Sequence, residues 1–259
     1  MNSDSLLQVE NLKKHFPIRR FMRQTTYVKA LDGVSFSLRS GETLAVVGES
    51  GSGKSTLAKC LMQIEEPTGG ALFFEGKNQQ DISIADWRKN VQMIFQDPYS
   101  SLNPRKKAID IISEPLAIAG QLSKGEITER AMEMMAKVGL RPEFASRYPH
   151  MFSGGQRQRI GIARSLMLRP RVLICDEPVS ALDVSIQAQV LNLLMDLQDE
   201  FQLSYIFISH DLSIVRHIAN SVIVMYLGQI VESGGREEIF SHPQHEYTKA
   251  LLASHPTID

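Results

Sequence analysis

The chain has 259 residues, of which 43% are hydrophobic and 22% charged, and its formal net charge is -1. This composition is typical of a globular protein with one large domain or one domain with a subdomain, and the lack of a basic excess disfavours nucleic acid as a partner. Cys60 and Cys175 stand far apart in apolar surroundings, which favours buried thiols over a disulfide or a metal pair. The N-terminus has no apolar core of signal-peptide length, and no apolar run of the chain approaches the roughly 20 residues that span a bilayer. We therefore expect any membrane association to come through a partner protein.

The first elements are strands. The opening LLQVENLKKHF alternates apolar and polar residues and predicts an edge-type antiparallel strand, although the basic segment from Lys13 to Arg23 favours a solvated loop. A second alternating stretch, VSFSLRSGE, ends in a turn. Thr43 to Val47 is a short apolar run, typical of a strand buried on both faces. A helix is expected from Lys54 to about Ile64, before a breaker cluster that begins at Pro67.

The middle of the chain differs from its flanks in composition and in residue spacing. From about Asn103 to Pro149 it is rich in Met, Lys and Glu at helical spacing, which predicts a helical subdomain inserted into an α/β core. Apolar strands then return in RVLICDEP and SYIFISH, with helices predicted at Val184 to Phe201 and Leu212 to Ala219. SVIVMYLGQIVESG predicts a hairpin centred on Leu227 and Gly228. Strands that alternate with helices predict a mostly parallel sheet covered on both faces.

A glycine-rich loop lies between the predicted strand and helix around residue 50. GESGSGKS at 48–55 matches G-x-x-x-x-G-K-[ST] in full. Glycines let successive N–H groups turn toward a phosphate, and the helix that starts here adds its positive end. Lys54 is expected at the β- and γ-phosphates of a triphosphate, and the Ser55 hydroxyl at Mg²⁺. The nucleotide-binding set is Gly48, Glu49, Ser50, Gly51, Ser52, Gly53, Lys54, Ser55 and Thr56.

Two adjacent acids end a later strand. Val172 to Asp176 is an apolar run that finishes in a carboxylate, and Glu177 follows it. Asp176 is expected to hold Mg²⁺ through a water, and Glu177 to orient or deprotonate the attacking water. Adjacent side chains of a strand point to opposite sides, so the two acids are expected to have different roles. Without the phosphate loop, a solvated pair at a strand end would explain them equally well.

A short motif at 152–156 connects the chain to a family. FSGGQ resembles the LSGGQ signature of ABC (ATP-binding cassette) proteins, with Phe in place of Leu. A serine and two glycines at the start of a helix offer a hydroxyl and bare N–H groups to an anion. The resemblance implies that ATP and Mg²⁺ are the cofactors. It also implies that the signature caps the γ-phosphate of ATP held by a second cassette in a head-to-tail dimer. These signature residues are Ser153, Gly154, Gly155 and Gln156.

Further motifs of the family follow in order. Gln96 resembles the Q-loop glutamine that contacts Mg²⁺ or water, which makes Ser55, Gln96 and Asp176 the metal set. SALD, which ends at Asp183, resembles the D-loop that crosses to the partner subunit. His210 resembles the switch histidine at the γ-phosphate, so Glu177, His210 and Gln96 form the expected catalytic set. Cassettes usually stack adenine on an early aromatic ring, for which Phe16 is the candidate and Tyr27 the alternative.

The resemblance covers nearly the whole chain and implies its fold. The implied fold is a P-loop NTPase of the ABC nucleotide-binding type. It has a mostly parallel central sheet, an N-terminal antiparallel β subdomain and an inserted α-helical signature subdomain. Within one domain, 1–259, the expected RecA-like core with its β subdomain covers 1–100 and 165–240. The helical subdomain covers about 103–164, and a tail covers 241–259.

Other segments resemble one branch of the family. QDPYSSLNPRKK and HPQHEYTKALLASHP are similar to the oligopeptide/dipeptide permease branch. This implies an ATP-hydrolysing subunit of a peptide importer, peripheral on the cytoplasmic face of the inner membrane. Its implied partners are a second, different ABC ATPase, two transmembrane permease subunits and an extracytoplasmic substrate-binding protein.

Other readings stay open at this point. Nickel or antimicrobial-peptide import is the alternative within the branch. A soluble ABC ATPase acting on nucleic acid is disfavoured, because only a short segment without sustained heptads separates Gln96 from Ser153. Many relatives continue into a cysteine-containing extension. The end at Asp259 leaves both a truncation and a shorter paralogue as alternatives.

Overall fold

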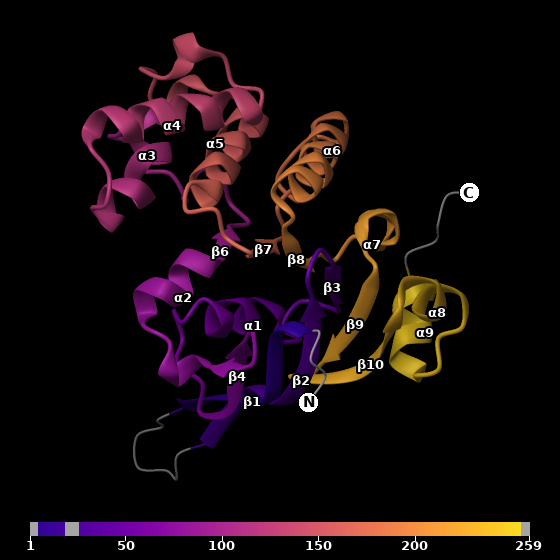
Figure 1. Cartoon of the computed structure of the whole chain (residues 1–259). Helices are drawn as coiled ribbons and strands as arrows, with labels where there is room; N and C mark the ends of the chain where they lie inside the picture. Colours follow the sequence, from indigo (N-terminus) through magenta and orange to yellow (C-terminus); the bar gives the residue numbers. More distant parts are fainter. Residues whose placement is uncertain (1–4, 19–25, 255–259) are drawn as a thin grey trace. The chain divides into compact units, whose positions relative to one another are not determined.

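The computed structural model describes residues 5–18 and 26–254, which form two compact units (Figure 1). The first unit contains the described residues up to Arg88 together with those from Ser204 onward. The second unit runs from Lys89 to Leu203. Within the described residues, no helix combines the length and apolar character needed to cross a bilayer.

One sheet of the first unit is antiparallel, in the order β2-β1-β4-β5. Its strands are β1 (Ser5–Ile18), β2 (Thr26–Arg39), β4 (Gly69–Phe74) and β5 (Lys77–Asn78). β1 pairs with both β2 and β4, so the strand expected at an edge is an inner one. The alternation of apolar and polar residues in β1 reflects one buried face of the sheet, on which Leu7 and Val9 lie. It does not indicate whether a strand is paired on one side or on both.

The basic segment expected to be a loop is partly a strand. Residues 13–18 belong to β1 and pair with residues 26–32 of β2. The remainder of that segment, 19–23, lies outside the described residues.

The mostly parallel strands of the first unit run in the order β10-β9-β3-β8. They are β3 (Thr43–Val47), β8 (Ser204–Ile208), β9 (Ser221–Tyr226) and β10 (Gln229–Gly235). β3 is parallel to both β8 and β9 and is buried along its whole length, as predicted. β10 turns back antiparallel to β9, which confirms the predicted hairpin. Leu227 and Gly228 both have positive φ there, as a tight two-residue turn requires.

Helices complete the first unit. They are α1 (Lys54–Leu61), α7 (Leu212–Ile218), α8 (Arg236–Ser241) and α9 (Glu246–Ala253), with the 3₁₀ turn η1 (Gln79–Asp81). α2 (Ile84–Asn90) runs across the boundary between the units. α1 ends three residues before the predicted Ile64, because Gln63 takes a left-handed conformation with φ 54°.

The second unit combines two parallel strands with four helices. The strands are β6 (Val91–Ile94) and β7 (Val172–Asp176), which pair directly. The helices are α3 (Ala108–Ala119), α4 (Lys124–Lys137), α5 (Gly154–Leu166) and α6 (Val184–Phe201), with the 3₁₀ turns η2 (Pro142–Phe144) and η3 (Pro149–Met151). α3 packs against both α4 and α5, and Met135 and Val138 are fully buried. The methionine-rich stripe therefore serves packing, as expected.

Candidate functional site

The phosphate loop connects β3 to α1, and glycines set its path. Gly48, Gly51 and Gly53 have φ of 145°, 80° and 111°. A Cβ at Gly48 would lie 2.2 Å from the carbonyl oxygen of Met225, and one at Gly53 would lie 2.4 Å from that of Ala30. The loop is thus fixed by close backbone contacts as well as by its own conformation.

Lys54 is enclosed by this loop and is only 6% exposed. Its Nζ donates hydrogen bonds to the carbonyl oxygens of Gly48 at 2.7 Å and Glu49 at 2.8 Å, and lies 3.4 Å from Ser52 Oγ. A buried ammonium next to a helix N-terminus is an arrangement that suits a polyphosphate. Ser55, in the first turn of α1, is exposed.

Two predicted catalytic residues meet in the second unit. Gln96 follows β6 and Glu177 follows β7, and these strands are parallel neighbours whose carboxyl ends lie together. Gln96 Nε2 donates a hydrogen bond of 2.8 Å to Glu177 Oε2. The carboxyl ends of strands are where α/β proteins bind ligands. The amide therefore holds the carboxylate at a position suited to act on a bound molecule.

The backbone at Glu177 is strained. Its φ is 46°, a left-handed value that costs a residue other than glycine about 1–2 kcal/mol. The Glu177 carbonyl accepts hydrogen bonds from the N–H and the hydroxyl of Ser180, which hold the turn. Asp176, which precedes it, is 8% exposed. Burial, with a smaller effect of the Asp176 carboxylate, raises the pKa of the Cys175 thiol.

The signature motif begins α5. Ser153 is its N-cap, and Ser153 and Gln156 form a capping box in which each side chain accepts the other's backbone N–H. Phe152 is buried and packs edge-on against Phe144, so the Phe that replaces the usual Leu fills an apolar site. A Cβ at Gly155 would lie 2.5 Å from Ile186 Cγ2. The second glycine thus permits a close approach to α6.

Two arginines of α5 hold the segment that follows Gln96. The Arg157 guanidinium lies 4.1 Å from the centre of the Tyr99 ring. Arg164 donates a 2.7 Å hydrogen bond to the Ser101 carbonyl, and burial lowers the pKa of its guanidinium. The sequence analysis did not identify either arginine. Their seven-residue separation, about two helical turns, is a signal that they share a face.

The remaining predicted residues belong to separate elements of the fold. His210 follows β8 and Asp183 is the N-cap of α6, and both are exposed. Phe16 is half-buried in β1 and pairs with Val28 of β2. Val28 lies two residues before Ala30, which contacts the phosphate loop. Tyr27 is 61% exposed. The choice between Phe16 and Tyr27 as the adenine platform remains a prediction.

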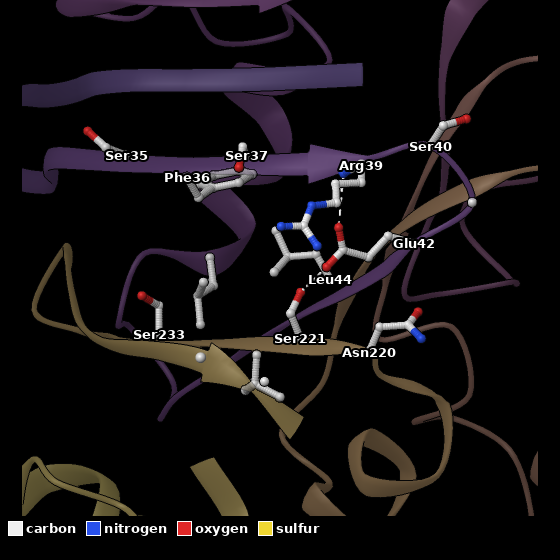
Figure 2. A pocket seen from close by; sticks show the side chains of 15 residues that line it. Ser35, Phe36, Ser37, Arg39, Ser40, Glu42, Leu44, Asn220, Ser221 and Ser233 are labelled. Atoms are coloured by element: carbon white, nitrogen blue, oxygen red, sulfur yellow. Dashed lines mark hydrogen bonds between the residues drawn. The ribbon is translucent and has the colours of Figure 1, made fainter. Parts of the chain in front are cut away.

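A separate pocket of 780 Å³ lies at the other end of β3 (Figure 2). It is lined by the amino end of β3, the end of β2 and the start of β9, whereas the phosphate loop follows the carboxyl end of β3. Glu42 accepts hydrogen bonds there from Ser221 Oγ and from the N–H of Arg39. This pocket is therefore distinct from the phosphate loop.

The predicted metal set suits Mg²⁺ by its chemistry. Ser55, Gln96 and Asp176 supply hydroxyl, amide and carboxylate oxygens, the ligands that this hard cation prefers. Within residues 5–18 and 26–254, no group of three or more His, Cys, Asp or Glu is placed to hold a metal. Mg²⁺ at a nucleotide usually takes its other ligands from phosphate and water, so one carboxylate is sufficient.

Comparisons with known proteins agree with these motifs. The model of the ABC transporter family matches residues 31–180. The dipeptide transport ATP-binding protein DppF of Haemophilus influenzae is 60% identical over 98% of this chain and 79% of its own length. DppF of Escherichia coli is 59% identical over 98% and 77% of the two chains. The oligopeptide transport ATP-binding protein AppF of Bacillus subtilis is 54% identical over 98% and 79%.

Solved cassettes share the fold. CbiO1 of Clostridium perfringens, part of the ABC transporter complex cbiONQ, superposes with a TM-score of 0.79 at 30% identity and covers 92% of both chains. A dimeric ATP-binding cassette in a post-hydrolysis state with ADP and Pi gives 0.76 at 27% identity, over 89% of this chain and 98% of that one. The predicted fold class is thereby confirmed. With its motifs in place and almost its whole length matched, this chain belongs to the ABC transporter family.

Proposed function

We propose that this chain is the ATP-binding and ATP-hydrolysing subunit of an ABC importer for dipeptides or oligopeptides. The hydrolytic part rests on one observation above all, the hydrogen bond between Gln96 and Glu177 at the ends of neighbouring parallel strands. The peptide part rests on relatives that are 54–60% identical and are dipeptide or oligopeptide transport ATP-binding proteins.

Nucleotide binding is assigned to the phosphate loop. Lys54 and the N–H groups of the loop bind the β- and γ-phosphates, and Phe16 or Tyr27 stacks on adenine. Lys54 already lies against backbone carbonyls of the loop, so a phosphate would exchange neutral partners for a charged one. Mg²⁺ would neutralise phosphate charge and would be held by Ser55, by Gln96 and, through a water, by Asp176.

Hydrolysis is assigned to the residues around Glu177. Its carboxylate orients a water and takes one proton as the water oxygen bonds to the γ-phosphorus, while the bond to the ADP oxygen breaks. The Gln96 amide keeps the carboxylate in position through the 2.8 Å contact. His210 contacts the γ-phosphate.

The rest of the proposed site comes from a second cassette. Ser153 and Gln156 form a capping box that fixes the N-terminus of α5, and Ser153 is exposed there. This helix N-terminus would meet the γ-phosphate of ATP bound by a partner. Asp183 reaches toward the same partner. We assign the partner as a different ABC ATPase, arranged head to tail, with two transmembrane permease subunits and an extracytoplasmic substrate-binding protein. The assembly places this chain on the cytoplasmic face of the inner membrane. The division into core, helical subdomain and tail, with the boundaries expected from the sequence, belongs to the same proposal.

Replacing Glu177 with Gln tests the hydrolytic assignment. The substitution keeps size and hydrogen-bonding capacity but removes the proton acceptor. ATP affinity should stay within about two-fold, whereas turnover should fall by about 10²–10⁴-fold. Equilibrium nucleotide binding and phosphate release measure the two quantities.

Glu143→Gln is the matched control, because Glu143 is exposed and lies 3.8 Å from Arg141 at its nearest approach. It should leave both quantities unchanged. Normal phosphate release by Glu177→Gln would show that this carboxylate is not the base. Peptide-stimulated ATPase of the assembled transporter tests the substrate, and stimulation by nickel instead would contradict the peptide assignment.

A further inference from the structure

A side chain from the end of the chain reaches the phosphate loop. The N–H of Glu49, the second residue of the loop, donates a 3.0 Å hydrogen bond to the Tyr247 hydroxyl, 198 residues away. Tyr247 lies in the first turn of α9 and is half-buried. Its ring packs on that of Tyr226, with centroids 4.3 Å apart. The contact joins two segments of the first unit that are remote in sequence.

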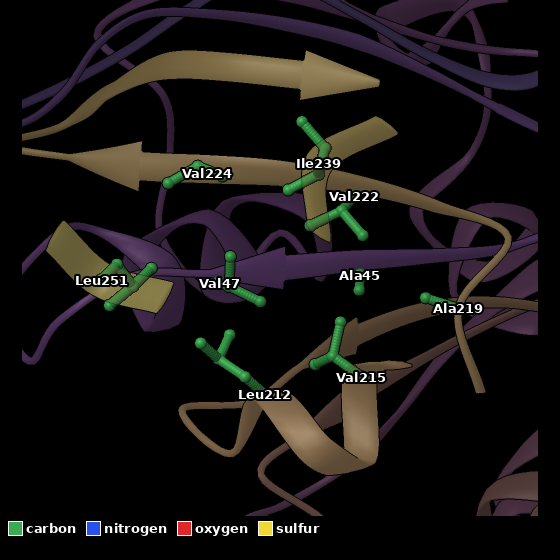
Figure 3. Packing of buried hydrophobic residues seen from close by; sticks show 9 residues of the cluster. All are labelled: Ala45, Val47, Leu212, Val215, Ala219, Val222, Val224, Ile239 and Leu251. Carbon is green, nitrogen blue, oxygen red and sulfur yellow. The ribbon is translucent and has the colours of Figure 1, made fainter. Parts of the chain in front are cut away.

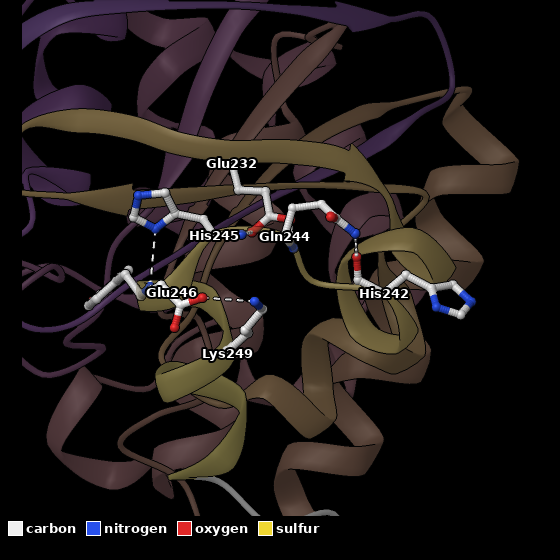
Figure 4. A network of polar contacts seen from close by, with 7 residues as sticks. Glu232, His242, Gln244, His245, Glu246 and Lys249 are labelled. Atoms are coloured by element: carbon white, nitrogen blue, oxygen red, sulfur yellow. Dashed lines mark hydrogen bonds and ion pairs between the residues drawn. The ribbon is translucent and has the colours of Figure 1, made fainter.

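Polar contacts fix the start of α9 (Figure 4). Glu232 of β10 accepts hydrogen bonds from the N–H groups of Gln244 at 2.7 Å and His245 at 3.1 Å. His245 caps the helix, because its Nδ1 accepts the N–H of Tyr247 at 3.1 Å. Tyr247 therefore starts from a backbone that is held on β10.

Apolar packing fixes the rest of α8 and α9 (Figure 3). Leu251 of α9 and Ile239 of α8 are 6% and 2% exposed. They belong to the same buried cluster as Val47, the last residue of β3 before the phosphate loop, and Val224 of β9. The helix that carries Tyr247 and the strand that leads into the loop thus share one core.

Two of the hydrogen bonds that hold the loop come from residues outside it. Gly228, in the β9–β10 turn, donates its N–H to the Ser52 carbonyl at 3.0 Å. Tyr247 holds the N–H of Glu49, whose carbonyl in turn receives the Lys54 ammonium at 2.8 Å. The tyrosine hydroxyl therefore acts on the residue that positions the lysine.

We propose that Tyr247 is a positioning residue for nucleotide binding, which holds the start of the phosphate loop in its binding shape. The inference rests on the proposed function, in which this loop binds the phosphates of ATP. A loop that is already ordered loses less conformational entropy when the ligand binds. A tyrosine hydroxyl is neutral near pH 7, and burial raises the pKa of Tyr247 further, so this group does not repel a phosphate.

Tyr247→Phe tests the inference in the full chain, because it removes the hydroxyl and keeps the ring on Tyr226. The KM and Kd for ATP should rise about three- to ten-fold, as expected for one hydrogen bond, with kcat within about two-fold. Hydrogen exchange of the Glu49 amide should become faster. Tyr226→Phe is the matched control, since no hydrogen bond of the Tyr226 hydroxyl is found among the described residues, and it should behave as wild type.

Two outcomes would overturn the role of Tyr247. One is an unchanged ATP affinity together with unchanged exchange at Glu49. The other is a loss of affinity only in proportion to a general loss of thermal stability, which would make Tyr247 a plain anchor for α9.

Lys54→Ala separates this inference from the proposed function. If wild type binds ATP and Lys54→Ala does not, the phosphate loop is the binding site whatever Tyr247→Phe does. If wild type itself fails to bind, both proposals are wrong.

Discussion

Glycines of the phosphate loop differ in what a side chain would meet. Gly51 has φ 80° but open space around it, whereas a Cβ on Gly53 would meet the Ala30 carbonyl at 2.4 Å. A side chain at position 51 would therefore cause backbone strain and no clash. At Gly53 a strand of the antiparallel sheet would have to move as well.

Replacing each glycine with Ala should separate these two effects. Gly51→Ala should lower the free energy of unfolding by about 1–2 kcal/mol through its left-handed backbone. Gly53→Ala should cost about 1–3 kcal/mol more, because overpacking is added. Urea unfolding without nucleotide measures both. Equal losses in the two variants would mean that β2 yields freely at Ala30.

Residue identities in the site could be predicted better than residue contacts. The phosphate loop, Asp176 and Glu177 could be proposed from the sequence because each belongs to a short contiguous motif. Gln96 and Glu177 lie 81 positions apart, and only the pairing of β6 with β7 brings them together. Tyr247 is a lone tyrosine in a tail. No periodicity or spacing relates it to Glu49, so its contact with the loop could not be inferred.

Helix α5 approaches α6 through a missing side chain. Gly155 lies where a Cβ would come within 2.5 Å of Ile186 Cγ2. The same glycine belongs to the signature motif, so its effects on packing and on nucleotide contact must be separated. A pair of substitutions on the two helices can do so.

A double-mutant cycle with Gly155→Ala and Ile186→Ala should show strong coupling. Gly155→Ala alone should lower the free energy of unfolding by about 1–3 kcal/mol through overpacking. With Ile186→Ala present, most of that loss should disappear, which gives a coupling energy of at least about 1 kcal/mol. Chemical denaturation of the four proteins measures it. Simple additivity would show that the helices separate without cost.

The types of most predicted elements could be read from the sequence, apart from the basic segment that is partly strand, and element ends could be predicted less well. α6 has the predicted bounds, and its buried stripe of Val190, Leu194 and Leu197 lies at the expected helical spacing. α1 was predicted too long, since the left-handed residue Gln63 carries no sequence signal as strong as glycine. β1 was placed at an edge, because alternation reports which face is buried and not which strands pair.

Each unit of the molecule contains one buried thiol. Cys60 of the first unit and Cys175 of the second are 0% exposed. Burial raises the pKa of Cys60 to about 11 and raises that of Cys175 as well. An unfolded thiol ionises near its ordinary value of 9.0. The contribution of Cys60 to stability is therefore complete below pH 9 and is lost as pH rises toward 11.

Thiol labelling should consequently report unfolding of both units. At pH 8 a thiol-specific reagent should label neither cysteine of the native chain. In denaturant it should label two thiols per chain. Cys60→Ala and Cys175→Ala variants assign each signal to its unit. Rapid labelling of either thiol under native conditions would mean that its unit opens far more easily than its packing indicates.

The sheet order has a consequence for synthesis on the ribosome. β3 lies between β8 and β9, which are made only after residues 89–203. At about 5–20 residues per second, this strand waits on the order of ten seconds for both neighbours. The stretch 89–203 is continuous and can collapse first, while the early segment stays open to chaperones until β8 and β9 have been made.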